Sequence, residues 1–359
     1  MEQRQRLYYL DMVKGLAIIL VVLGHIEYIS DPLRTWISSF HMPVFFIVSG
    51  MLLSLKKENE RDFAEILPKK IRGLLIPYFW FSLLYFVIDI LNVILHKITP
   101  LTFVKDLIAS LTFYGVSVLW FLPALFIAET GFLFLYKKLP LVFSLSLVFF
   151  LAIGAYLVQI ILGSVYTAHE SSLLITSLID FARVFIRGII AMSFVCIGFI
   201  AFPDISKKKE FSLLQLILGI VFFLLNLILS QKNGCIDFHY IILENVPLFY
   251  LCAILGSFAL ILICKNMKEL KPLAFFGKNS LIVMATHVNT YVLYAAILIS
   301  WQIDRIVTRA KSYIFIFNIM AFTFLFEAMI IVIINRFFPF VLGKGSFLCR
   351  KKDSPTSTQ

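Results

Sequence analysis

Long apolar runs separated by short polar segments dominate this sequence of 359 residues. Hydrophobic residues make up 60% of the chain and charged residues only 15%, and the mean hydropathy is +0.94. A soluble domain contains about a quarter charged residues, whereas about 20 consecutive apolar residues allow one helix to cross a bilayer. Backbone polar groups in lipid must be satisfied within the segment. The pattern therefore predicts an all-α integral membrane protein, a polytopic bundle of helices.

Ten runs are predicted to be transmembrane helices, the second of them short. They comprise residues 8 to 29, 40 to 55, 74 to 95, 115 to 136, 141 to 163, 184 to 202, 211 to 230, 246 to 264, 279 to 300 and 313 to 335. Ten crossings place both termini on one side of the membrane. The N-terminus is basic and then apolar, but no small-residue cleavage site follows, so the first run is expected to be a retained span.

Basic residues predict the orientation, because cytoplasmic loops retain Lys and Arg. With the N-terminus inside, the inner segments hold 22 of these residues and the outer loops hold 7. Both termini are therefore expected to be cytoplasmic. We expect residues 1 to 340 to form a single transmembrane domain and residues 341 to 359 to form a short, disordered cytoplasmic tail.

The net charge of +11 does not indicate a nucleic-acid partner, because the basic residues punctuate apolar runs and do not gather on one soluble face. The five cysteines have no CxxC spacing and fall mostly in apolar segments, so we expect packing residues and no metal site.

Three ionisable residues interrupt the first predicted span, "LDMVKGLAIILVVLGH". Lys14 and His25 are 11 residues apart, which places them about 20° apart around a helix and about 16 Å apart along it. Asp11 can neutralise Lys14 one turn away, so one interpretation is a helix-end anchor with His25 at the headgroups. His41 opens the second span, however, so two histidines are expected to meet at the outer end of one hairpin. Ionisable groups inside a span usually indicate function.

Five segments together resemble acyltransferase family 3, nearest its fucose 4-O-acetylase-like branch of sugar acetyltransferases. They follow the family's order and reach across nearly the whole chain: "LDMVKGLAIILVVLGH", "FHMPVFFIVSGMLL", "KKIRGLLIPYFW", "VLWFLPALF" and "GKNSLIVMATHVN".

The resemblance implies a multi-pass enzyme of the bacterial cell membrane that transfers acetyl from cytoplasmic acetyl-CoA. The implied acceptor is a hydroxyl of an envelope polysaccharide or lipid-linked sugar. Lys14 and His25 match the family's basic residue and essential histidine. Lys69 and Arg72 match its paired basic positions after the second span. His287 matches its late-helix histidine and is expected on the acceptor side.

The chain also departs from the family pattern. The base of the first helix is Lys14, where Arg is commoner, which keeps the charge but loses the two-pronged contact to a phosphate or carboxylate. Trp120 and Glu129 are nine residues apart, so the chain does not clearly contain the family's Trp-to-Glu motif. The resemblance therefore assigns no role to Glu129.

Acyl transfer to a hydroxyl needs a general base or a nucleophile, together with donors for the oxyanion. His25 is the predicted base, because an imidazole suits proton transfer near neutrality. His41 is the second catalytic candidate, and Lys14 is expected between the donor and His25. An acyl-His25 intermediate remains an open alternative.

The donor side is predicted at the inner loop "LPKKIRG". Lys69, Lys70 and Arg72, together with Lys14, are expected to bind acetyl-CoA through charge-assisted contacts to its phosphates. The alternative is plain positive-inside anchoring, which fits Lys70 better than Arg72.

The acceptor side is predicted near Arg183 and Arg187, which lie one helical turn apart and could clamp an anionic glycan or a lipid pyrophosphate. Pairing with Asp180 or Glu170, or interface anchoring, is the alternative. Trp120 is expected to line the acceptor site, although an aromatic belt is the default for a Trp near an interface.

Two other functions remain open. A glycan transporter or polymerase-like protein would also be a Phe-rich bundle, although no clear internal repeat supports a transporter of inverted-repeat design. The same fold could also transfer succinyl or another acyl group. Three further polar residues inside spans, Asp89, Asn92 and Glu327, have no assigned partner.

Overall fold

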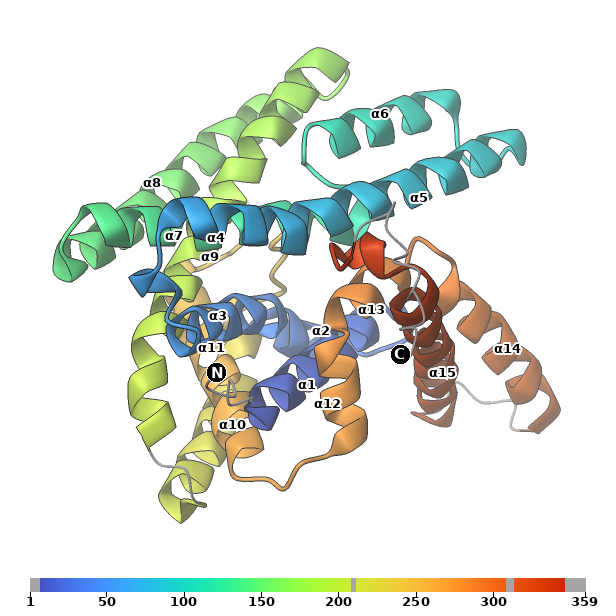
Figure 1. Cartoon of the computed structure of the whole chain (residues 1–359). Helices are drawn as coiled ribbons and strands as arrows, with labels where there is room; N and C mark the ends of the chain where they lie inside the picture. The colour runs from blue at the N-terminus through green and yellow to red at the C-terminus, as the bar shows by residue number, and fades with distance from the viewer. Residues whose placement is uncertain (1–6, 208–210, 308–312, 346–359) are drawn as a thin grey trace, which may run out of the picture.

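The computed structural model describes residues 7–207, 211–307 and 313–345, and over these ranges the chain is a helical bundle (Figure 1). The described residues form no β-strand; a single bridge joins Asp237 and Ile242. Eight helical segments are long and apolar enough to cross a bilayer. The chain is therefore an all-α, polytopic membrane protein.

Most of these eight segments coincide with the predicted spans. They are Asp31–Leu55, with α2 (Asp31–Ser38) and α3 (His41–Leu55); Phe63–Ile94, with α4 (Phe63–Lys70), η2 (Ile71–Leu75) and α5 (Ile76–Ile94); Ser117–Lys138, with η3 (Ser117–Trp120) and α7 (Phe121–Lys138); α8 (Leu141–Ala168); α9 (Leu173–Lys207), of which Leu173–Ile205 is counted; α10 (Leu213–Asn233); α11 (Val246–Lys265); and α15 (Tyr313–Phe337).

The remaining helices are shorter. They are α1 (Tyr8–Gly24), η1 (Glu58–Glu60), α6 (Pro100–Leu111), α12 (Lys271–Lys278), α13 (Ser280–Thr286), α14 (Val292–Val307) and η4 (Pro339–Leu342).

One prediction is wrong: the ninth of the ten predicted spans is not a single helix. The run from 279 to 300 is two helices, because α13 ends at Thr286 and α14 begins only at Val292. Tyr291, with φ of 63°, lies in the break. The first predicted span is also shorter than expected, since α1 has 17 residues and ends at Gly24. Both departures occur where a histidine follows the helix.

Glycines allow the central helices to touch backbone to backbone. A Cβ on Gly198 of α9 would lie 1.9 Å from the Ile47 carbonyl oxygen of α3, and one on Gly50 would lie 1.9 Å from that of Val195. The same reciprocal contact joins α1 and α12, where a Cβ on Gly277 would lie 1.7 Å from the Asp11 carbonyl oxygen. Small residues at such crossings are how helices associate in lipid.

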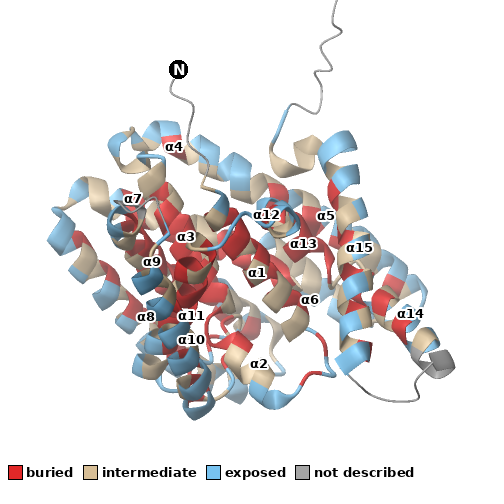
Figure 2. Cartoon of the chain, turned by 90° about the horizontal axis from the view of Figure 1, so that it is seen from below, coloured by how far each residue is buried: buried red, intermediate tan, exposed pale blue. Residues whose placement is uncertain are grey.

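Burial follows the position of each helix in the bundle. Buried residues concentrate on α1, α3, α9 and α11, whereas α8 and α10 are largely exposed (Figure 2). Their exposed side chains are mostly Leu, Ile, Val and Phe, which suits a surface facing lipid.

Inside the bundle, two of the three polar residues that the sequence left without a partner have one. Asn92 accepts a 2.6 Å hydrogen bond from the Tyr291 hydroxyl, and Glu327 contacts Thr286 Oγ at 2.8 Å.

Loops predicted to lie on one side of the membrane contact one another. On the predicted inner side, Lys137 donates to the carbonyls of Asn59 and Arg61. On the predicted outer side, Gln231 donates to the Pro32 carbonyl at 2.9 Å, and the Ile236 amide donates to Ser38 Oγ at 3.1 Å. The arrangement thus has two distinct ends, each built from one set of loops.

The cysteine prediction is confirmed at three positions: Cys196, Cys252 and Cys264 are free and buried. Cys235 is also free, but it is exposed. Cys349 and most of the predicted tail lie outside the described residues.

The α3–α9 crossing predicts a specific sensitivity. Gly198→Ala should lower the free energy of unfolding by about 1–3 kcal/mol, because the new Cβ forces two backbones apart. Thermal unfolding in detergent measures this cost. Gly163→Ala in α8 is the matched control: no atom lies within 4 Å of its ideal Cβ, and Ala favours a helix more than Gly does. Equal unfolding temperatures for the two variants would contradict the tight crossing.

Candidate active site

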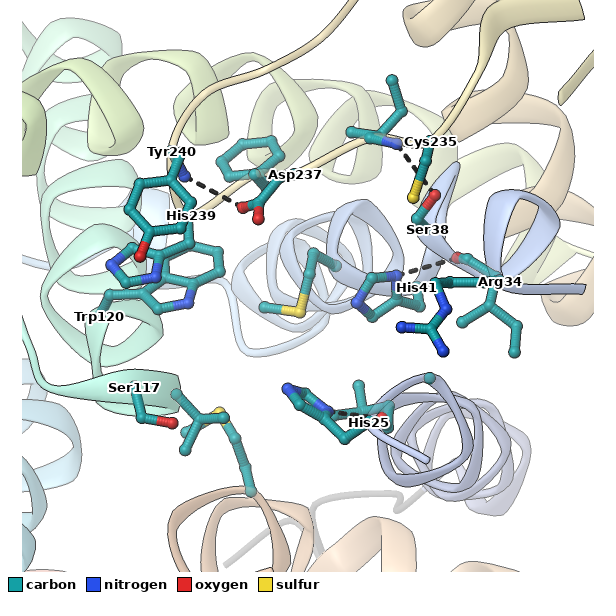
Figure 3. Close-up of a pocket in the computed structure, with 18 residues that line it drawn as sticks. His25, Arg34, Ser38, His41, Ser117, Trp120, Cys235, Asp237, His239 and Tyr240 are labelled. Carbon is teal, nitrogen blue, oxygen red and sulfur yellow. Dashed lines mark hydrogen bonds between the residues drawn. The ribbon is translucent and has the colours of Figure 1, made fainter. Parts of the chain in front are cut away.

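Segments from the predicted outer side enclose a cavity of about 470 Å³. It lies between the end of α1, the α2–α3 corner, η3 and the loop from 234 to 245, with one residue from α13. Figure 3 shows His25 and His41 on one side of this cavity and Trp120 with His239 on the other. We call it the outer cavity.

His25 is held by the end of its own helix. Its Nδ1 lies 2.8 Å from the Val21 carbonyl oxygen, one turn back, so this nitrogen carries the proton and donates it. In the neutral ring the other nitrogen, Nε2, then keeps its lone pair. His25 is exposed where it borders the outer cavity, so that lone pair is available to a reacting group.

His287 lies directly behind His25 and is fully buried. Its Nδ1 donates to the carbonyls of Val283 and Met284, at 2.8 and 3.0 Å. Its Nε2 is therefore an acceptor and lies 3.4 Å from Nδ1 of His25, with the two rings edge to face. His287, which was expected on the acceptor side, therefore lies against His25 and is not among the residues that border the outer cavity.

His41 is held in the same way. Its Nδ1 donates to the Ile37 carbonyl oxygen at 2.9 Å, which again leaves Nε2 free. His41 borders the outer cavity together with His25, so the prediction that the two histidines meet at one end of the hairpin is confirmed. Arg34 lies beside them (Figure 3) and donates to the Ile26 carbonyl at 3.3 Å.

Flat side chains form the opposite wall. The Trp120 ring stacks on His239 at 5.8 Å between centroids, with only 7° between the planes. The backbone leading to Trp120 is unusual, since Gly115 and Ser117 both have positive φ, at 83° and 51°. Burial, with smaller contributions from the charges of Arg187 and Arg183, lowers the pKa of His239 to about 3. His239 is therefore neutral at physiological pH.

Arg183 and Arg187 lie behind this wall and not among the residues bordering the cavity. Arg187 is fully buried and lies over the rings of Tyr114 and Trp120, 4.5 and 5.4 Å from their centroids. Arg183 pairs with Asp180 at 3.0 Å. This pairing is the stated alternative to binding an anionic acceptor. Arg187 therefore supports the wall that carries Trp120, whereas Arg183 lies over the ring of Tyr166.

A second cavity of about 200 Å³ lies toward the other end of the bundle. Its lining is mostly Leu, Phe and Val, with Lys14, Ser49 and Glu129 as its only polar side chains besides Ser280. Lys14 pairs with Asp11 at 3.0 Å, as predicted. We call this space the inner cavity.

A buried ion pair closes one side of the inner cavity. Lys70 Nζ lies 2.9 Å from Glu129 and 2.6 Å from Glu58, and Glu129 also accepts from Ser49. Lys70 enters the bundle at η2, a stretch of π-helix that rotates the chain between α4 and α5. Lys69 and Arg72, by contrast, are exposed and border neither cavity.

Sequence reasoning assigned no site role to several of these residues. In the sequence Arg34 counts only toward the charge of the outer loops. His239 and Asp237 lie together in "GCIDFHY", an outer loop whose closely spaced polar residues are the signal that marks them. Among the described residues, no group of three or more His, Cys, Asp or Glu side chains could hold a metal ion.

Comparison with known proteins gives one match. The model of a protein family described as an acyltransferase domain, from acyltransferase family 3, matches residues 7–335. No curated protein sequence and no solved structure matches the chain.

Because Lys70 and Glu129 form a buried ion pair, substitutions at the two residues should have coupled effects on the free energy of unfolding. Lys70→Met should lower the free energy of unfolding by roughly 3–5 kcal/mol, because it leaves buried carboxylates unpaired. Adding Glu129→Gln should recover part of that loss, since it removes one stranded charge. Thermal unfolding in detergent measures both.

The matched control is Lys57→Met, which removes an exposed Lys whose Glu60 partner lies 3.8 Å away and should change stability little. A loss in Lys70→Met no larger than in Lys57→Met, or no recovery in the double variant, would contradict a structural role for the buried pair.

Proposed function

The chain belongs to acyltransferase family 3 and is a membrane acyltransferase, and from this premise we propose the reaction that it performs. It transfers acetyl from cytoplasmic acetyl-CoA to a hydroxyl of an envelope polysaccharide or lipid-linked sugar, in the bacterial cell membrane. It acts on the sugar in the manner of the fucose 4-O-acetylase-like branch.

The observation that carries this proposal is the free Nε2 of His25 at the edge of the outer cavity. In the proposed step the acceptor hydroxyl gives its proton to this nitrogen while its oxygen attacks the thioester carbonyl carbon. The carbon–sulfur bond then breaks, and the CoA thiolate leaves and takes up the proton that His25 holds, which returns the imidazole to its neutral form. His287 is a positioning residue here, because it contacts His25, does not border the outer cavity and fixes the orientation of the His25 ring.

Two neighbours suit the developing negative charge. The oxygen of the tetrahedral intermediate needs donors aimed at it in a site that excludes water. Arg34 and His41 border the same cavity as His25, and a guanidinium keeps its charge at any physiological pH. We assign Arg34 to the oxyanion and keep His41 as a second donor or a partner of the acceptor hydroxyl. The alternative in which His25 first takes the acyl group uses the same groups.

The inner cavity fits the donor arm. The pantetheine arm of CoA is long and thin, with two amides along its length and an apolar thioester end. The inner cavity is lined mainly by apolar side chains, which suit that end, and its polar side chains include Lys14 and Ser49. Lys69 and Arg72 are exposed on the predicted cytoplasmic side, where they can contact the phosphates of CoA outside the cavity. Lys14 then lies between that surface and His25, as the helical spacing predicts.

The aromatic wall of the outer cavity fits a sugar acceptor. Apolar faces of sugar rings pack on flat aromatic side chains, and Trp120 with His239 presents such a face opposite His25. Arg187 lies behind Trp120 and supports it, so its role in this proposal is to position the wall and not to clamp a phosphate.

The same two cavities distinguish acetyl transfer from the two alternative functions, which are glycan transport or polymerisation and succinyl transfer. A glycan transporter or polymerase has no use for a held imidazole beside an apolar donor cavity, and the family match favours acyl transfer. A succinyl group would bring a carboxylate into a mostly apolar inner cavity, where Lys14 is its nearest cationic partner. Acetyl is therefore the proposed group, and labelled acetyl-CoA and succinyl-CoA compare them directly.

The reaction predicts a strict requirement for His25. His25→Ala should reduce transfer of labelled acetyl to envelope glycan by at least about 100-fold, because the general base is lost. The assay uses purified protein in proteoliposomes. His169→Ala is the matched control, since His169 makes the same bond to a carbonyl four residues back but is exposed at the end of α8, away from both cavities. Transfer by the His25 variant at the rate of the control would remove His25 from the mechanism.

A further inference from the structure

Met284 is the residue of α13 that borders both cavities. It is almost fully buried, at 7% exposure, so its side chain fills the space between them. Lys14, Ser49 and Glu129 line only the inner cavity, and His25, His41 and Trp120 only the outer one. The described residues thus place a single thioether side chain of α13 between the two spaces.

Met284 is also tied directly to the histidine pair. It lies one helical turn before His287, and its carbonyl oxygen accepts a 3.0 Å hydrogen bond from Nδ1 of that residue. His287 in turn contacts His25. Whatever passes Met284 therefore emerges beside the imidazole that faces the outer cavity.

Across from Met284, the boundary between the two cavities is formed by side chains that are packed against other residues. It is formed where η3 joins α7: Val118 and Trp120 border the outer cavity, and Phe121 and Leu122 border the inner one. Trp120 contacts the Arg187 guanidinium and stacks on the His239 ring. Phe121 packs on Phe46 at 5.0 Å between ring centroids. Movement is therefore easier on the Met284 side.

Methionine suits a partition that moves. Its unbranched side chain has three rotatable bonds and fills irregular gaps in several conformations. Its helix, α13, has only 7 residues and ends in the break before α14. A change of rotamer at Met284 would join the two cavities without moving a long helix.

We propose that Met284 is the gate that the acyl group crosses between the donor and acceptor cavities, and that its side chain sets the longest acyl chain transferred. This inference rests on the proposed acyl transfer from the inner to the outer side. The thioester carbon reaches His25 when the Met284 side chain rotates, and the acyl chain then packs beside Met284 at the wall of the outer cavity. Each further methylene therefore has to occupy volume that this side chain fills.

Substitutions at Met284 test the gate through acyl-chain selectivity. The measurement is kcat/KM in proteoliposomes with acetyl-, propionyl- and butyryl-CoA. Met284→Ala removes the side chain beyond Cβ and should raise the butyryl-to-acetyl ratio by about tenfold or more, since one methylene in a pocket changes selectivity by that order. Met284→Trp should block transfer of all three donors, while CoA still raises the thermal unfolding temperature of the variant.

Met51→Ala is the matched control. Met51 is fully buried in α3 and is not among the residues that border either cavity, so its truncation costs similar packing but should leave the butyryl-to-acetyl ratio unchanged. If Met284→Ala does not insert, Met284→Val provides a smaller truncation, and its ratio should rise in the same direction.

The outcomes separate this inference from the proposed function. Wild-type protein that transfers no acyl group from any of these donors would overturn the proposed function. Wild-type protein that transfers acetyl, with the same butyryl-to-acetyl ratio in the Met284 truncations as in Met51→Ala, would overturn the gate alone. Rapid acetyl transfer by Met284→Trp would also overturn it.

Discussion

Three imidazoles near the outer cavity are each held by a hydrogen bond to a helix carbonyl four residues earlier in the chain. His25 bonds the carbonyl of Val21 at the end of α1, and His287 bonds that of Val283 at the end of α13. His41 bonds the carbonyl of Ile37 at the end of α2. Each bond uses Nδ1–H, so it holds the ring against its helix and determines the tautomer. The same interaction leaves His25 and His41 with a free Nε2 at the cavity.

Two short helices place two of these imidazoles at and behind the cavity. α1 stops after 17 residues and α13 after 7, and the gaps after them make room for a cavity where longer helices would fill the bundle. Glycine contacts then hold the shortened helices in place, since α1 meets α12 backbone to backbone at Gly15 and Gly277. The proposed reaction depends on this geometry, because a reacting hydroxyl must reach an imidazole that is rigid yet exposed.

Much of this arrangement was predictable from local sequence, and particular parts were not. Apolar run lengths predict most spans, and the 11-residue spacing of Lys14 and His25 correctly places them toward opposite ends of the bundle, one at each cavity. The break at His287 is not evident from the overall hydropathy of the run from 279 to 300, which is that of one span. The local signal is the polar cluster "THVNTY" at 286–291, where the helix stops.

Long-range partners were the other limit. Nothing in the chain near Glu129 indicates that Lys70 approaches it, because the two lie on different helices and meet through a π-helical turn. The Trp120–His239 stack likewise joins segments far apart in sequence. Arg183 and Arg187 share a helix face, as predicted, but only the fold shows that this face is packed against Tyr114 and Trp120.

In the proposed reaction the acyl group crosses the bundle from the inner cavity to His25. Proteoliposomes of one orientation test this crossing, with labelled acetyl-CoA confined to one compartment and the sugar acceptor to the other. Label should appear on the acceptor only when the donor is on the side of Lys69 and Arg72 and the acceptor is on the side of His25. Equal labelling in both arrangements, or labelling only when both substrates share one compartment, would contradict it.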